Sequence, residues 1–165
     1  MVALAALGVD RPGPMLDDQR APEVPGPDEL VSPLVDTRVS IPMRGRYDLR
    51  PAIGSAPFTA GSEALTGGWI RTTDDDPVDE ILVAAFTDAW PPAVFSRMQL
   101  PVGVPTVDLT IHFRQAPSGA PSWSLVRFRT QVAAEGYLEE DGEVWSTDGR
   151  LLAQSRQLAV LLSPG

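Results

Sequence analysis

Asp88 is the residue whose type conflicts most with its position in the sequence. It falls within a predicted helix over Asp76–Arg97 that is otherwise mostly apolar, seven residues after Ile81 and three after Ala85. Residues at these spacings share one face of a helix, and the helix dipole disfavours a carboxylate near the C-terminus. Asp88 therefore has two interpretations. It is either a terminal residue that turns out to water or caps the following loop, or a catalytic carboxylate.

The predicted helix has start and stop signals of its own. Residues 74–76 are all aspartate and offer an N-cap, Pro77 suits the first helical position, and Asp79 and Glu80 place carboxylates in the first turn. Pro91-Pro92 then ends or kinks the helix. Apolar residues lie on nearly every side, so we expect a sheet to wrap around the helix. They are Val78, Ile81, Leu82, Ala85, Phe86 and Ala89 on one face and Val83 and Ala84 on the other.

Composition narrows the possible functions. The 165 residues are 43% hydrophobic and 21% charged, which is typical of one soluble domain, and the net charge of -9 argues against nucleic-acid binding and against a polybasic membrane surface. There is no cysteine, and all 13 basic residues are arginine, which excludes thiol nucleophiles, zinc–thiolate sites and Schiff-base lysines. His112 is the single histidine, so several imidazoles cannot gather around a metal. We expect no cofactor and no metal.

The N-terminal region differs in composition from the rest. Met1–Gly8 lacks the basic flank and the length of a signal peptide or membrane span, so we expect a cytoplasmic protein. Val9–Pro33 is rich in proline and acidic residues, which favours an extended linker. We therefore divide the chain into a linker over residues 1–38 and a folded domain over residues 39–165. Val2–Leu7 resembles the last strand of a domain that is not in this chain.

Strand patterns surround the predicted helix. Thr106–Arg114 alternates most clearly, with Val107, Leu109, Ile111 and Phe113 on one face and Thr106, Asp108, Thr110, His112 and Arg114 on the other. In Arg150–Leu162, residues Leu151, Ala153, Ser155, Gln157 and Ala159 share one face, and Leu152, Leu158, Val160 and Leu162 the opposite one. Further strands are expected at Val39–Leu49, Gly67–Thr72, Trp123–Ala134 and Gly136–Thr147.

One helix against a curved antiparallel sheet is the hotdog arrangement, an α+β fold. Because both faces of Arg150–Leu162 carry apolar residues, the face turned away from the helix needs a cover. We expect a partner hotdog to provide it.

Three stretches resemble the C-terminal half of type II, double-hotdog acyl-CoA thioesterases. They are Leu82–Ala93 (LVAAFTDAWPPA), Val104–Arg114 (VPTVDLTIHFR) and Asp148–Gln157 (DGRLLAQSRQ), within a resemblance that covers about Tyr47–Leu162. The family hydrolyses acyl-CoA to a free acid and CoA with an Asp, a Thr and a Gln that hold and activate a water. The resemblance carries these roles to Asp88, Thr106 and Gln157. It implies Asp88 as general base and the other two as groups that orient the water.

The resemblance also implies a second hotdog domain, supplied by upstream sequence, by another copy or by a separate subunit. Leu109 stands where many members have histidine, which leaves substrate details open.

Other interpretations of these residues remain. Thr106 could merely begin a strand, Gln157 could hydrogen-bond backbone, and a lone strand histidine such as His112 is more often structural. The alternative function is a non-catalytic acyl-binding or interaction hotdog domain of a larger thioesterase assembly. Hydratase chemistry would need a histidine–acid pair near the helix, and the position of His112 on a strand disfavours it.

Overall fold

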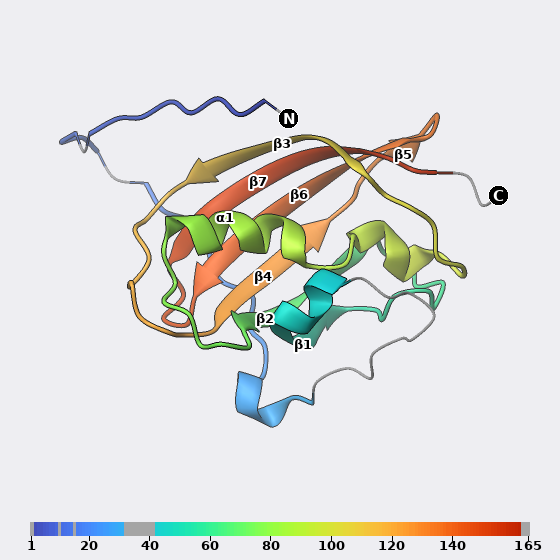
Figure 1. Ribbon diagram of the computed structural model, residues 1–165, viewed down its shortest axis with the longest axis horizontal. Coiled ribbons are helices and arrows are strands. Elements are labelled where there is room, and N and C mark those ends of the chain that lie inside the picture. The colour runs from blue at the N-terminus through green and yellow to red at the C-terminus, as the bar shows by residue number, and fades with distance from the viewer. Residues whose placement is uncertain (1, 10, 15, 32–41, 163–165) are drawn as a thin grey trace.

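The computed structural model describes residues 2–9, 11–14, 16–31 and 42–162 (Figure 1). These residues form one α-helix and seven strands, with short 3₁₀ helices between them. The main elements are β1 (Tyr47–Gly54), β2 (Leu65–Thr72), α1 (Glu80–Ala89), β3 (Thr106–Phe113), β4 (Ser124–Arg129), β5 (Ala133–Ala134), β6 (Tyr137–Ser146) and β7 (Leu151–Val160). The 3₁₀ helices are η1 (Pro27–Glu29), η2 (Pro42–Arg46) and η3 (Ala93–Arg97).

The strands form a single antiparallel sheet in the order β1-β2-β4-β6-β7-β3, with β5 paired to β6. Figure 1 shows the sheet curving around α1, which lies against its concave face. The core between them contains Phe86 and Val83 from the helix and Val126, Val144 and Ala153 from the strands. The predicted α+β hotdog fold is confirmed.

The helix is shorter than predicted. It begins at Glu80, because Asp79 is the N-cap and its side chain accepts a hydrogen bond from the Leu82 N–H at 2.8 Å. Pro77 is not its first residue but forms an isolated bridge with Pro121, and the Val78 N–H donates to a neighbouring loop carbonyl. The helix ends at Ala89, and residues 93–97 form η3 instead of a further helical turn.

The prediction that the sheet covers the helix on nearly every side is wrong. Val83, Phe86 and Thr87 are buried against the sheet, but Ile81 is 80% exposed. The sheet therefore covers one side of α1, and the opposite side carries an apolar residue in contact with solvent.

Two strand predictions also change. In Val39–Leu49, residues 39–41 lie outside the described residues, Pro42–Arg46 is a 3₁₀ helix, and β1 begins only at Tyr47. Trp123–Ala134 divides into β4 and the two-residue β5.

Register shifts interrupt the alternation of β1, β3 and β7, and those in β3 and β7 change predicted faces. In β3 the register shifts between Thr106, which pairs with Ala159, and Asp108, which pairs with Leu158. In β7 residue Leu152 is extra, since Val144 pairs with Ala153 and Trp145 with Leu151. Leu152 consequently joins the core beside the helix, and Leu151 joins an apolar cluster with Trp145, the reverse of their predicted faces.

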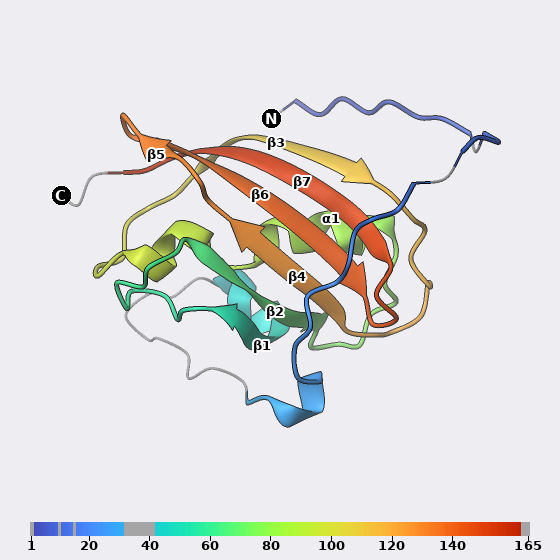
Figure 2. The same ribbon diagram turned by 180° about the vertical axis from the view of Figure 1, so that it is seen from behind.

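The N-terminal segment covers part of the convex face of the sheet. Figure 2 shows it crossing the strands on the side away from α1. Ala21, Val24 and Leu30 pack on a cluster that contains Trp69, and the Trp69 indole N–H donates to the carbonyl of Pro25 at 2.9 Å. No α-helix forms in the described part of 9–33. Part of the face expected to need a partner is thus covered by the chain itself.

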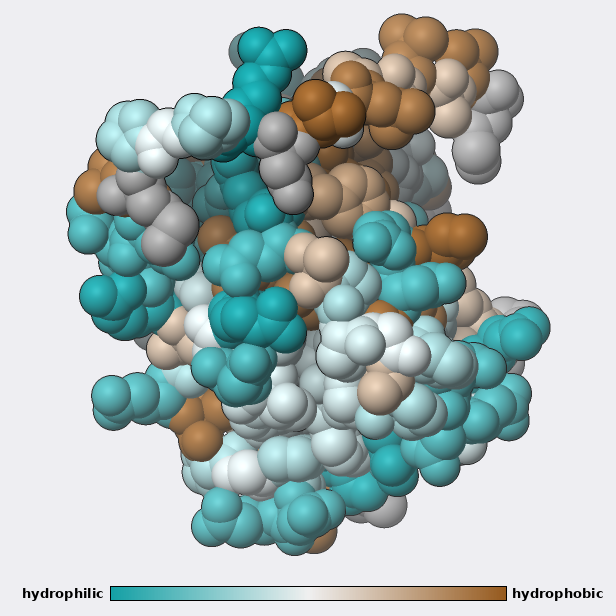
Figure 3. All heavy atoms as spheres, turned by 90° about the vertical axis from the view of Figure 1, so that its left-hand side faces the viewer, coloured by the Kyte–Doolittle hydropathy of each residue, from teal (hydrophilic) through white to brown (hydrophobic). Residues whose placement is uncertain are grey.

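Residues 2–9 form an extended arm whose side chains are exposed. Figure 3 shows a mostly hydrophilic side of the molecule with apolar residues at its upper edge, where Figure 1 places this arm. Of the helices in the described ranges, none has both the length and the apolar character needed to cross a bilayer.

Candidate active site

Asp88 occupies the last turn of α1. The helix stops one residue later, where Trp90 adopts an extended conformation ahead of Pro91-Pro92. The Trp90 indole N–H donates to the buried hydroxyl of Thr66 at 2.9 Å, which fixes the chain just beyond the helix. Asp88 is therefore held at a defined point at the end of the helix.

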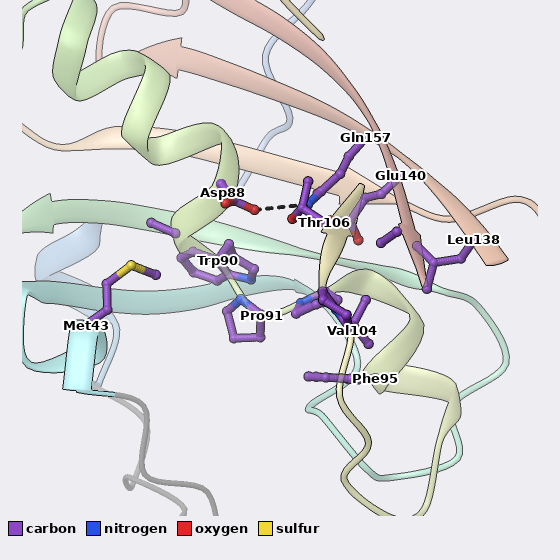
Figure 4. Close-up of a pocket in the computed structure, with 14 residues that line it drawn as sticks. Met43, Asp88, Trp90, Pro91, Phe95, Val104, Thr106, Leu138, Glu140 and Gln157 are labelled. Atoms are coloured by element: carbon purple, nitrogen blue, oxygen red, sulfur yellow. Dashed lines mark hydrogen bonds between the residues drawn. The ribbon is translucent and has the colours of Figure 1, made fainter. Parts of the chain in front are cut away.

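Gln157 reaches from β7 to both other predicted site residues. Its Nε2 lies 3.1 Å from Oδ1 of Asp88 and also donates to Oγ1 of Thr106 (Figure 4). An ionised carboxylate can only accept hydrogen bonds, so the amide must turn its NH₂ group toward Asp88. The two N–H bonds of Gln157 are then used, one on each partner. The expected convergence of Asp88, Thr106 and Gln157 is present.

Thr106 joins this group because of the bulge in β3. Paired residues share a face of the sheet, and Thr106 pairs with Ala159 while Leu109 pairs with Gln157. Thr106 and Leu109 therefore both face the helix. Asp108 pairs with Leu158 and faces the other way. The predicted alternation holds from Asp108 to His112, which share one face, but it is wrong for Thr106, because one extra residue in the strand moves Thr106 to the opposite face.

A pocket of about 240 Å³ opens beside the three residues (Figure 4). Asp88, Thr106 and Gln157 lie in its wall together with Glu140. The other lining residues are apolar and come from the helix end, η2, η3, the segment before β3, and strands β6 and β7: Met43, Ala89, Trp90, Pro91, Pro92, Phe95, Val104, Pro105, Leu138 and Ala159. A polar cluster thus adjoins an apolar cavity.

The surroundings of Asp88 raise the pKa of its carboxyl group, although the residue is exposed to solvent. Burial of the carboxylate raises its pKa, and the hydrogen bond from Gln157 lowers it in part. A raised pKa makes Asp88 a stronger base than an ordinary aspartate. One of its carboxylate oxygens accepts the hydrogen bond from Gln157.

Glu140 is a second acid in the pocket and was not among the site residues predicted from the sequence. It lies on β6 directly opposite Gln157, and its carboxyl group accepts a hydrogen bond from the Ala93 N–H at the start of η3. The sequence does indicate that Glu140 faces inward, because it lies at even spacing from the apolar residues Leu138 and Val144. The neighbouring acidic residues, however, are typical of a strand exposed to solvent.

The described residues of the site do not include a set of metal ligands. In the part of the chain that the structure describes, no three His, Cys, Asp or Glu side chains gather where they could hold a metal ion. The chemistry available to the pocket is that of two carboxyl groups, a hydroxyl and an amide.

Comparison with known families supplies the decisive observation. Residues 17–161 match the family described as the acyl-CoA thioesterase C-terminal domain. The chain belongs to this family. The resemblance stated from the three sequence motifs is confirmed, and the match begins well inside the segment predicted as a linker, so the division at residue 38 stays a prediction.

Solved structures similar to this chain share its fold. A hotdog protein of unknown function from Alicyclobacillus acidocaldarius has 28% identity over 96% of this chain and 60% of its own, with a TM-score of 0.85. A proposed thioesterase II of Thermobifida fusca has 25% identity over 86% of this chain and 54% of its own, with a TM-score of 0.65.

More distant similarity extends to acyl-CoA thioesterase II TesB2 of Mycobacterium marinum, with 17% identity over 94% of this chain and 60% of that protein, and a TM-score of 0.68. The chain therefore spans less than two thirds of each of the three proteins. A comparison with proteins of curated function found no match.

Proposed function

We propose that the chain hydrolyses fatty acyl-CoA thioesters to a free acid and CoA, as part of lipid metabolism in the cytoplasm. The contact of Gln157 with both Asp88 and Thr106 carries the proposal, because it gathers a base, a hydroxyl and an amide at the mouth of an apolar pocket. Membership of the thioesterase family supports the reaction type.

Asp88 is the general base in this proposal. Its carboxylate takes a proton from a water molecule, and the water oxygen forms a bond to the thioester carbonyl carbon. The carbon–sulfur bond then breaks, and its electron pair leaves with the CoA sulfur, which takes up a proton. The raised pKa of Asp88, caused by burial, suits proton abstraction near neutral pH.

Thr106 and Gln157 orient the water. Because Thr106 accepts a hydrogen bond from Gln157, its own O–H remains available to donate to a water or a substrate oxygen. The amide oxygen of Gln157 can in turn accept a hydrogen bond from the water. The two residues thus hold the attacking oxygen beside the base.

The apolar lining of the pocket favours a hydrocarbon acyl group. Trp90, Phe95, Val104 and Leu138 offer a surface that gains free energy when apolar area leaves water. The acyl chain occupies this cavity, and the thioester carbonyl lies at its polar mouth.

A second hotdog domain completes the assembly. Three observations support it: β3 is an edge strand, Val107 and Phe113 on it are exposed, and Ile81 projects from the uncovered side of α1. An exposed apolar residue on each of two adjoining elements is typical of an interface. Sedimentation at increasing concentration tests this, and a monomer that stays monomeric at the highest concentration, with no other subunit required for activity, contradicts it.

The reaction is tested by measuring CoA release from saturated acyl-CoA esters of increasing length. Because the chain has no cysteine, a thiol-reactive chromophore reports CoA alone, without background from the protein. We expect turnover that Asp88→Asn lowers by roughly a hundredfold or more. Tight binding of acyl-CoA with no CoA release at any length would favour the non-catalytic acyl-binding function instead.

A further inference from the structure

Glu140 is a buried acid that the proposed hydrolysis does not use. Its side chain is 6% exposed, and it lines the same pocket as Asp88. Gln157, which bonds Asp88, is its direct cross-strand neighbour. In Figure 4 the Glu140 side chain extends toward the region around Thr106 rather than away from it. It is therefore built into the site rather than placed on a solvated face.

Among the described residues, no cation acts on this acid. The charged groups that act on it are Asp88 from α1 and Glu139 from its own strand, and both are carboxylates. Among the described residues that line the pocket, none is arginine or histidine. When two carboxyl groups share a pocket without a positive partner, ionising both of them has a large free-energy cost.

The neutral form of Glu140 fits its surroundings. One carboxyl oxygen accepts the Ala93 N–H, which the carbonyl oxygen of a protonated acid can also do. The Thr130 hydroxyl is buried without a hydrogen-bond partner and lies near enough to the carboxyl group to influence it, although outside hydrogen-bonding geometry. Burial raises the pKa of Glu140 to about 7, and the negative charge of Asp88 adds to this, against the opposing Ala93 N–H.

We propose that Glu140 is a positioning residue that acts through Asp88: it keeps its proton while Asp88 is ionised, so that the pocket carries one negative charge when substrate binds. The inference rests on the proposed hydrolysis for its effect on turnover. The pairing of the two acids itself does not depend on that activity.

In this pair the two acids have different protonation states. Asp88 is open to solvent and receives a hydrogen bond from Gln157, so it gives up its proton first. Glu140 is enclosed and keeps its proton. Two acids with environments that separate their protonation in this way are typical of acid–base sites. When Glu140 ionises at higher pH, a second charge faces the thioester oxygen as that oxygen becomes negative, which disfavours the transition state.

The first test is a ¹³C NMR titration of the side-chain carboxyl groups in the full chain. The Glu140 resonance is the one absent from Glu140→Gln. We expect its titration midpoint near pH 7, and a fall of about one pH unit in Asp88→Asn, which removes the facing charge. A midpoint at the ordinary value of 4.5, or one that Asp88→Asn leaves unchanged, overturns the proposal. If Glu140→Gln folds poorly, the Glu140 carboxyl resonance can be assigned through its connectivity to the backbone instead. The effect of Asp88→Asn on its titration midpoint can then still be measured.

The second test is the pH profile of kcat. In the wild-type chain we expect kcat to fall above the midpoint measured for Glu140, and in Glu140→Gln we expect the ratio of kcat at pH 8.5 to kcat at pH 6 to rise several-fold. Asp141→Asn is the matched control, since Asp141 is the next residue on β6, faces away from the helix and pairs with Arg156. A purely structural Glu140 would leave the profile shape unchanged, which overturns the proposal. A coupled titration without any thioester hydrolysis would reject the proposed function and retain the acid pair.

Discussion

The amide nitrogen of Gln157 lies 3.1 Å from Oδ1 of Asp88, although 69 residues separate the two in the chain. This contact joins the middle of β7 to the last turn of α1 across the concave face of the sheet. The same amide holds Thr106 at the start of β3, 51 residues away. Three elements that meet at one side chain make the site sensitive to substitutions that barely change the fold.

Asp88→Asn should lower kcat by roughly a hundredfold or more, because an amide cannot accept the proton of the attacking water. The side chain is isosteric and solvent-accessible, so the melting temperature should stay close to that of the wild type. CoA release and thermal melting measure the two effects. Asp108→Asn, an exposed aspartate on the outer face of β3, should change neither. Equal losses in both variants would contradict the role of Asp88.

Gln157→Ala should move the acidic limb of the kcat/KM profile to higher pH. The hydrogen bond from Gln157 lowers the pKa of Asp88, so its loss lets burial raise that pKa further. Asp88 then becomes ionised only at higher pH. The matched control is Gln154→Ala, since Gln154 lies on the same strand but bonds Arg114. An acidic limb that stays in place after Gln157→Ala would show that the contact does not tune the base.

Thr106→Val should reduce kcat by about tenfold or more, since it keeps the shape of the side chain but removes the hydroxyl that orients the water. Thr106 is exposed, so stability should change by no more than about 1 kcal/mol. Thr106→Ser keeps the hydroxyl and should retain most of the activity. If Val and Ser variants behave alike in steady-state kinetics, the hydroxyl has no part in the reaction.

Glu140 should make the domain less stable as pH rises from about 4.5 to about 7. Its pKa is near 7 when folded and near 4.5 when exposed, so the folded state binds the proton more tightly between these values. The free energy of unfolding therefore falls across this window, by roughly 3 kcal/mol. Urea unfolding at pH 5 and pH 8 measures the change, and Glu140→Gln should reduce the difference. If the free energy of unfolding falls by the same amount between pH 5 and pH 8 in the wild type and in Glu140→Gln, Glu140 is not the group responsible.

Removal of residues 1–31 should destabilise the domain by roughly 1–3 kcal/mol, because it uncovers the apolar cluster beneath Ala21, Val24 and Leu30. Tryptophan fluorescence should shift to the red as Trp69 and Trp145 meet water. Removal of residues 1–16 is the control, and it should leave melting and fluorescence unchanged, since the large apolar side chains described there, such as Leu4 and Leu16, are already exposed. Identical melting of both truncated forms would show that the segment adds no stability.

Local patterns were sufficient for much of the fold. The apolar spacing before Asp88 predicted a helix there and Pro91-Pro92 a stop or kink, although the helix ends at Ala89 and not at Arg97. The Asp148-Gly149 turn predicted the hairpin between β6 and β7. These features depend on backbone preferences and on residues close together in the chain. Their boundaries shifted where a contact from elsewhere intervened, as at Pro77, which pairs with Pro121 instead of entering the helix.

The sequence by itself determined which groups are available: no thiol, no lysine, one histidine, and an Asp, a Thr and a Gln in motifs that resemble a thioesterase. Only the tertiary structure decided which of them face one another. The bulge in β3 turns Thr106 toward Gln157 and Asp108 away, and the register of β6 against β7 places Glu140 beside them. A bulge and a register belong to a pair of strands, so alternation within one strand cannot reveal them.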